Sequence, residues 1–145
     1  ATMNNTWNYK EDLQDPEAFE KIEKQYDIKI PEKLKDFVAE HNGASPSECV
    51  FDSEGGEHLF GAVLSFDSGE TCKTTIYQAM DTVQNKSVIP FAEDPFGNYI
   101  CLSMENGKIL FWSHETDEMT VAGDELESFL KGLHQSNKMV KSYNL

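Results

Sequence analysis

The chain has 145 residues, of which 39% are hydrophobic, and it carries a formal net charge of −14 at pH 7. A chain of this length buries a core without disulfides or metal ions. We therefore expect one domain over residues 1–145, with its core at roughly residues 15–133. All 12 basic residues are lysines. So acidic a surface repels phosphates and anionic membranes and attracts basic proteins, which excludes nucleic acid and membranes as partners.

The chain begins without a basic segment followed by an apolar stretch, and no run approaches the roughly 18 apolar residues of a membrane helix. Three widely spaced cysteines lie in or beside apolar sequence. This placement favours buried, reduced thiols over a disulfide or a zinc site. We therefore expect a cytoplasmic protein without a metal or a cofactor.

Two amphipathic helices are predicted in the first third of the chain. Residues 15–17 provide an N-cap followed by a proline in the first turn. Pro31 opens a second helix in the same way, and residues 41–43 form a stop signal. Apolar residues then recur at helical spacing on one face of each helix. These faces consist of Phe19, Ile22 and Tyr26 in the first helix and Leu34, Phe37 and Val38 in the second.

The middle of the chain changes to strand-like sequence. Residues 59–66 are too short and too closely flanked by turn residues for a helix, so they are predicted to form a strand. Residues 88–92 predict another strand, and Pro90 indicates that it lies at an edge or reaches its end there. Residues 74–83 predict a short helix between them, with inward side chains at Ile76, Tyr77 and Met80.

The last third predicts a turn, a hairpin and a helix. Residues 94–98 are dense in turn-forming types, among which glycine and asparagine tolerate positive φ. Two apolar strands follow over residues 99–104 and 108–112, joined by residues 105–107 with their Asn-Gly pair. The order helix, helix, strands, helix indicates an α+β domain with an antiparallel sheet. The face of the last helix is Leu126, Phe129, Leu130 and Leu133.

Catalytic signatures are missing from the sequence. It contains no nucleotide-binding loop, no calcium loop, no metal-binding histidine pair and no nucleophile elbow. One group remains that is suited to acid–base chemistry, His114 with Glu115 and Asp94. A solvated histidine at a strand end is the simpler interpretation. We therefore expect a binding protein rather than an enzyme, with no catalytic residue.

Acidic residues are concentrated in two lysine-free stretches, residues 48–70 and 115–127. Both stretches fall at or near predicted loops and strand ends. If the sheet brings these ends together, they form one negative surface beside Phe111 or Trp112, and an aromatic anchor within a charged rim suits a protein interface. The alternative is a dispersed, solvated acidic surface. The candidate partner-binding residues are Asp52, Glu54, Glu57, Glu93, Asp94, Trp112, Glu115, Asp117 and Glu118.

Several short sequence segments occur in a characteristic order along the chain. Residues 88–102 comprise an apolar strand ending in Pro-Phe-Ala, an acidic turn with glycine and asparagine, and a second apolar strand. The other segments are residues 31–34, 42–43, 60–61, 109–115 and 129–130. Together they resemble the Smi/Knr family of the SUKH superfamily. Ala44 departs from the glycine usual in that family, and residues 49–57 match no family pattern.

The resemblance implies an α+β fold with a twisted antiparallel sheet flanked by helices. It also implies an immunity protein that binds and neutralises a cognate bacterial toxin. Nuclease domains carry basic clefts for phosphates, so an acidic inhibitor suits a nuclease toxin in particular. Eukaryotic relatives are described as regulators of cell-wall assembly. A general interaction scaffold or regulator without a toxin partner is therefore the alternative.

Overall fold

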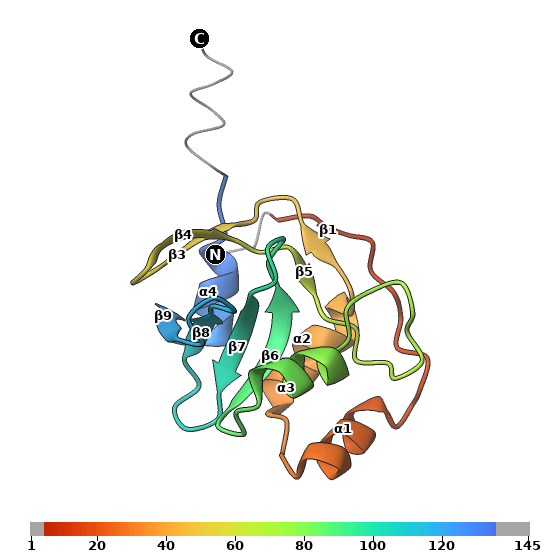
Figure 1. Cartoon of the computed structure of the whole chain (residues 1–145). Helices are drawn as coiled ribbons and strands as arrows, with labels where there is room; N and C mark the ends of the chain where they lie inside the picture. Colours follow the sequence, from red (N-terminus) through yellow and green to blue (C-terminus); the bar gives the residue numbers. More distant parts are fainter. Residues whose placement is uncertain (1–4, 136–145) are drawn as a thin grey trace.

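A five-stranded antiparallel sheet forms the centre of the computed structural model, which describes residues 5–135 (Figure 1). Its strand order is β5-β6-β7-β8-β9. The strands are β5 Ala62–Val63, β6 Val88–Glu93, β7 Tyr99–Ser103, β8 Ile109–Trp112 and β9 Met119–Gly123. The helices are α1 Ala18–Tyr26, α2 Glu32–His41, α3 Ile76–Val83 and α4 Leu126–Lys131. This arrangement confirms the predicted α+β class.

Two small antiparallel sheets complete the fold. One joins β1 Trp7–Asn8 to β2 Ser45–Pro46. The other is a hairpin of β3 Val50–Ser53 and β4 Gly56–Leu59. In Figure 1 this hairpin passes over the ends of the central strands, and it contributes one wall of the site described below.

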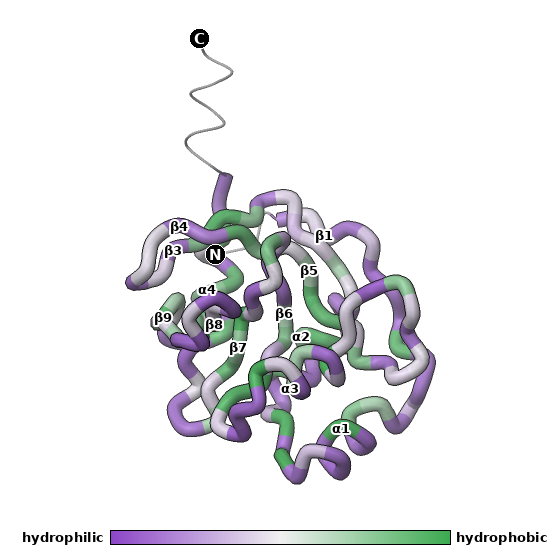
Figure 2. Tube along the Cα trace, in the orientation of Figure 1, coloured by the Kyte–Doolittle hydropathy of each residue, from purple (hydrophilic) through white to green (hydrophobic). Residues whose placement is uncertain are grey.

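The two faces of the central sheet pack against different elements. Phe111 joins the main core, where aromatic contacts link it through Phe51 to Phe129 of α4. Cys101 and Trp112 point to the other face and form a smaller cluster with Val83 of α3. Figure 2 shows hydrophobic stretches along β5 and β7 and hydrophilic residues in the turn after β8. The sheet is thus buried on both faces, while the polar turns lie at the ends of its strands.

The predicted helices and the β7–β8 hairpin are present. Two helix bounds differ from the prediction, because α1 begins only at Ala18 and α4 ends at Lys131, before Leu133. Ile22 and Leu34 are buried, as their spacing on the helix faces predicts. In α3 the hydroxyl of Thr75 accepts from the amide of Gln78 at 3.2 Å, and the Gln78 side chain accepts from the Thr75 amide at 2.9 Å. This reciprocal cap satisfies two amides that a helix start otherwise leaves unpaired. Local patterns were sufficient for these elements because each helix buries one continuous face and the hairpin is specified by its turn.

The predicted strand over residues 59–66 is wrong in its extent. β4 ends at Leu59, and β5 covers only two residues. Between them, Gly61 passes so close to β6 that a Cβ atom would lie 2.9 Å from the carbonyl oxygen of Glu93. Farther on, Ser65 forms a single parallel bridge with Thr75. Much of this apolar segment is buried irregular chain, and an apolar run alone does not distinguish that from a strand.

Pro90 lies inside the sheet rather than on an edge strand. β6 has β7 on one side and β5 on the other, but β5 pairs only with Ala92 and Glu93. The register between β6 and β7 also shifts between Pro90 and Ala92. A proline is accepted at such an irregularity because the missing amide hydrogen breaks no regular ladder.

The cysteines differ in their exposure. Cys101 is fully buried, and burial raises the pKa of its thiol well above the usual value. Cys49 is half-buried, whereas Cys72 is exposed in the loop before α3, so the prediction of buried thiols is wrong for Cys72. Across residues 5–135, no helix is long and apolar enough to cross a membrane.

Candidate partner-binding surface

A hollow of about 530 Å³ lies between β4 and two turns, formed by residues 94–98 and 113–118. Its lining includes Glu57, Asp94 and Glu115, which the sequence places far apart. None of the side chains that line it is a lysine. We call this feature the acidic hollow. It unites three of the nine candidate binding residues on one surface.

The floor of the acidic hollow is a stacked pair of rings. His58 lies over Phe111 with ring centroids 3.7 Å apart and an angle of 14° between the planes. His58 Nε2 is 2.7 Å from the hydroxyl oxygen of Ser53. Burial lowers the pKa of His58, although the carboxylates of Asp94 and Asp52 oppose this shift. His58 is therefore neutral at pH 7 and does not offset the negative charge of the hollow.

The side chain of Asp94 stabilises the first turn, residues 94–98, by hydrogen bonds to its backbone. Its Oδ1 accepts from the amides of Phe96 and Asn98, both at 2.8 Å. The Asp94 side chain is buried, while the turn projects Phe96 outward with 67% of its surface exposed. A large exposed aromatic residue beside carboxylates resembles the anchors that carry much of the binding energy in protein interfaces.

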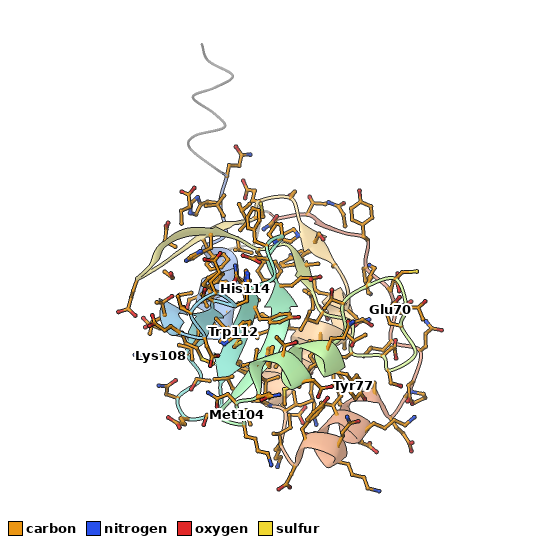
Figure 3. The ribbon with its side chains drawn as sticks, viewed as in Figure 1. Glu70, Tyr77, Met104, Lys108, Trp112 and His114 are labelled. Carbon is orange, nitrogen blue, oxygen red and sulfur yellow. The ribbon has the colours of Figure 1, made fainter. Side chains whose placement is uncertain are left out.

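Asn98 connects the first turn to the second. Its side-chain nitrogen Nδ2 donates to Asp94 Oδ2 at 2.8 Å, and its side-chain oxygen accepts from the backbone amide of His114 at 2.9 Å. The same oxygen lies 2.7 Å from His114 Nδ1. In Figure 3, His114 and Trp112 are labelled near the end of β8. His114 is thus engaged by an amide rather than by a carboxylate, and this contact does not form the acid–base group considered from the sequence.

Gly97→Val is expected to lower the free energy of unfolding by about 1–3 kcal/mol. Gly97 has a φ of +89°, which a β-branched residue adopts only with strain. Thermal unfolding followed by circular dichroism measures the effect. Gly69→Val is the matched control, because Gly69 faces open space and lacks a positive φ. A Gly97→Val variant that keeps its melting temperature but no longer binds its partner would assign this glycine to recognition instead of folding.

Residues 14–132 match the sequence model of the SMI1/KNR4 family (SUKH-1). The chain belongs to this family. A curated relative, the SPbeta prophage-derived uncharacterized protein YokK of Bacillus subtilis (strain 168), is 43% identical over 44 residues. The match covers 28% of this chain and 23% of the relative, so the chain spans under a quarter of that protein's length. Family membership confirms the resemblance found in the sequence and suggests an immunity-type protein.

Two further candidate residues of this SMI1/KNR4 protein lie on the β3–β4 hairpin. Asp52 is paired with Glu57 across the hairpin and is exposed, with its Oδ2 3.6 Å from His134 Nε2. Glu54 is used internally, because its Oε1 accepts from the amide of Val121 at 3.0 Å. Asp52 therefore adds negative charge beside Glu57, whereas Glu54 holds the hairpin against β9.

Other candidates lie on or near the α3 face of this family member. Trp112 is 4% exposed, and its indole N–H donates to Asp117 Oδ1 at 2.7 Å. Glu93 is paired with Tyr99, which stacks on Trp112, so Glu93 lies on this face as well. Burial raises the pKa of the Glu93 carboxyl. Glu118 is exposed in the turn after β8. The expectation that Trp112 serves as an aromatic anchor therefore does not suit its burial, and Phe96 offers the exposed ring.

Sequence reasoning missed Phe96 and His58. The signal for Phe96 was its position between Pro95 and Gly97 in a tight turn, where a large ring has no core to enter. His58 offered no comparable signal, because its stacking on Phe111 depends on a hairpin that the sequence did not predict.

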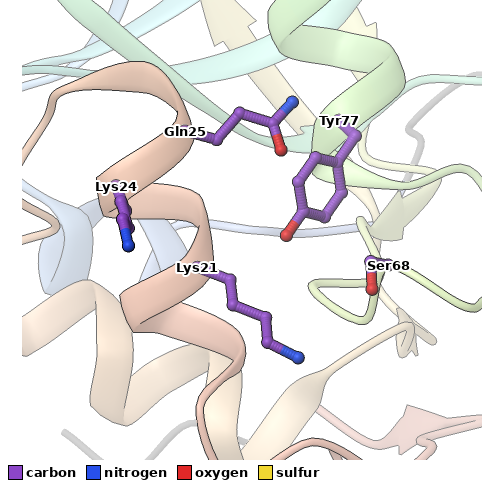
Figure 4. Close-up of a pocket in the computed structure, with 5 residues that line it drawn as sticks. All are labelled: Lys21, Lys24, Gln25, Ser68 and Tyr77. Atoms are coloured by element: carbon purple, nitrogen blue, oxygen red, sulfur yellow. The ribbon is translucent and has the colours of Figure 1, made fainter.

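A second hollow of the SMI1/KNR4 protein, of about 480 Å³, has the opposite charge (Figure 4). Lys21 and Lys24 of α1 line it together with Tyr77 of α3. Lys21 is already paired, because its ammonium group donates to the carboxylate of Asp15. Among residues 5–135, no group of three or more histidine, cysteine, aspartate or glutamate side chains is placed to hold a metal ion. The acidic hollow is the stronger candidate for recognition of a basic protein.

Proposed function

We propose that this chain is an immunity protein that binds a cognate bacterial toxin and neutralises it, and that the toxic domain is a basic nuclease. The observation that carries the proposal is the acidic hollow, which Glu57, Glu115 and the exposed Phe96 line together. Membership of the SMI1/KNR4 family supports the same function. In this proposal the protein acts in the cytoplasm of the cell that makes it.

Electrostatics gives the mechanism of neutralisation. A nuclease binds phosphates in a positively charged cleft, and a protein with a net charge of −14 is drawn toward that cleft at long range. Once docked, the exposed carboxylates of Glu57 and Glu115 occupy the positions that phosphates would take. Phe96 then supplies apolar contact area, which charge pairs alone do not provide. The toxin is inhibited because its substrate no longer reaches the cleft.

Association with the toxin is expected to slow by about tenfold or more when the ionic strength rises from about 0.1 M to about 1 M. The Debye length falls from about 10 Å to about 3 Å over this range, which removes long-range attraction. Stopped-flow mixing with a catalytically inactive toxin measures the rate, and co-expression with the active toxin measures protection of the cell. Equal rates at both salt concentrations would remove the electrostatic mechanism. Binding of a non-toxic partner without protection would favour the scaffold alternative.

A further inference from the structure

One edge of β4 has no strand partner among residues 5–135, because β4 pairs only with β3. The amide of Phe60 donates to the carbonyl of Cys49 at 2.7 Å, so these two residues form a hydrogen-bonded pair of the hairpin. Hydrogen-bonded and non-hydrogen-bonded pairs alternate along such a ladder. The backbone groups of Glu57 and Leu59 therefore point away from β3, and no backbone hydrogen bond engages them within the described residues.

The opposite edge of the hairpin is already occupied. Val50, which lies opposite Leu59, exchanges backbone hydrogen bonds with His134 at 2.9 and 3.0 Å. At the tip, Glu54 donates its amide to the carbonyl of Val121 at 3.2 Å. The hairpin is thus fixed along β3, and β4 presents the free edge. Such an edge is a template for the addition of another strand.

The free edge of β4 borders the acidic hollow. Glu57, His58 and Leu59 all line it. Successive side chains of a strand point to opposite faces. A hollow facing one side of β4 would therefore contact every second residue, whereas a hollow facing its edge contacts all three. Phe96 and Glu115 line the hollow from the two turns. The free backbone groups, the carboxylates and an exposed ring therefore surround one space.

We propose that the edge of β4 takes up an extended, basic segment of the toxin as an additional strand. This inference rests on the proposed function, because it names how the partner binds. The added strand exchanges backbone hydrogen bonds with Glu57 and Leu59, as in other strand additions. Alternate lysine or arginine side chains of the segment then lie between Glu57 and Glu115, and an apolar side chain packs on Phe96.

Charge selects a basic segment over a second copy of this chain. Edge-to-edge pairing of two copies would bring Glu57 of one copy close to Glu57 of the other, and like charges placed opposite each other destabilise a sheet. Asp52, which is exposed on the neighbouring strand, adds to this repulsion. A lysine-bearing strand meets no lysine in the lining of the hollow.

The test uses a capped hexapeptide of alternating lysine and valine, titrated into the full chain and followed by backbone amide chemical shifts. The largest shifts are expected at Glu57, Leu59 and Phe96. Methylation of the alternate peptide nitrogens that face β4 removes the backbone hydrogen bonds and is expected to weaken binding about tenfold. Methylation of the other alternate nitrogens leaves the affinity within about twofold, and a glutamate–valine peptide does not bind.

A variant of the protein provides the reciprocal test. Leu59→Pro removes an amide hydrogen that points away from β3, and it is expected to weaken binding of the lysine–valine peptide more than fivefold relative to Leu59→Ala. Cross-strand contacts between β3 and β4 verify that the hairpin is intact. If Leu59→Pro does not fold, the two methylated peptides still decide the question, because they require only the wild-type chain.

Three results would overturn the proposal: no shifts at β4, equal affinity for the two methylated peptides, or self-association of the chain through this edge. These results are separable from the fate of the proposed function. Toxin neutralisation with equal affinity for both methylated peptides removes strand addition and leaves the immunity function. Edge-dependent peptide binding without neutralisation of any toxin removes the immunity function and leaves β4 as a peptide-binding edge.

Discussion

Phe91→Ala is expected to lower the free energy of unfolding by about 3–5 kcal/mol. Phe91 is completely buried on β6. Its ring centroid lies 6.3 Å from that of Phe37 on α2 and 6.5 Å from that of Phe60, which follows β4. Removal of the ring leaves a cavity where helix, sheet and hairpin meet, and none of these elements can close it without moving the others.

Urea unfolding followed by tryptophan fluorescence measures the decrease in the free energy of unfolding caused by Phe91→Ala. Phe96→Ala is the matched control, because this phenylalanine lies only five residues farther along the chain and is 67% exposed. Its truncation is expected to change the free energy of unfolding by no more than about 0.5 kcal/mol. A cost below about 1 kcal/mol for Phe91→Ala would show that the core between α2 and the sheet is packed loosely.

Combined replacement of Glu57 and Glu115 by lysine is expected to reduce toxin affinity by about a hundredfold or more. The two carboxylates lie on different walls of the acidic hollow, one on β4 and one in the turn after β8. Their reversal places lysines against a basic partner, and such like-charge contacts cost several kcal/mol. Both side chains are exposed, so the variant is expected to unfold at nearly the wild-type temperature.

The control for charge reversal is Glu105→Lys. Glu105 is also exposed in a turn, but it lies at the other end of the β7–β8 hairpin. Glu54 and Asp117 are unsuitable for this test, because their carboxylates hold Val121 and Trp112 and their replacement would disturb the fold. Calorimetric titration with inactive toxin compares the variants. Wild-type affinity in the double variant would place the interface outside the acidic hollow.

The parts of the fold that the sequence predicted are those defined by contacts within one segment. α2 has a proline at its start, a glycine after its end and an apolar face between them, all within residues 31–43. The β7–β8 hairpin is similarly specified by two apolar runs and an Asn-Gly turn, where Gly107 adopts a φ of +75°. Such signals need no knowledge of the rest of the chain.

The β3–β4 hairpin escaped prediction because its stabilising contacts come from elsewhere. Its tip is held by β9, where Ser53 accepts from the hydroxyl of Thr120 at 3.1 Å, and its start is held by His134. For the same reason, the sequence could not show which of the candidate site residues lie together. Sequence distance separates Glu57 from Glu115, and only the path of β4 past the two turns brings them to one hollow.

In the described chain, backbone groups at both edges of the central sheet are engaged by other segments. At β9, Glu54 uses its carboxylate and its amide to occupy the outward groups of Val121. At β5, Val63 donates its amide to the carbonyl of Ala44 at 2.8 Å. Copies of this chain therefore cannot extend the central sheet into a continuous fibre through these groups.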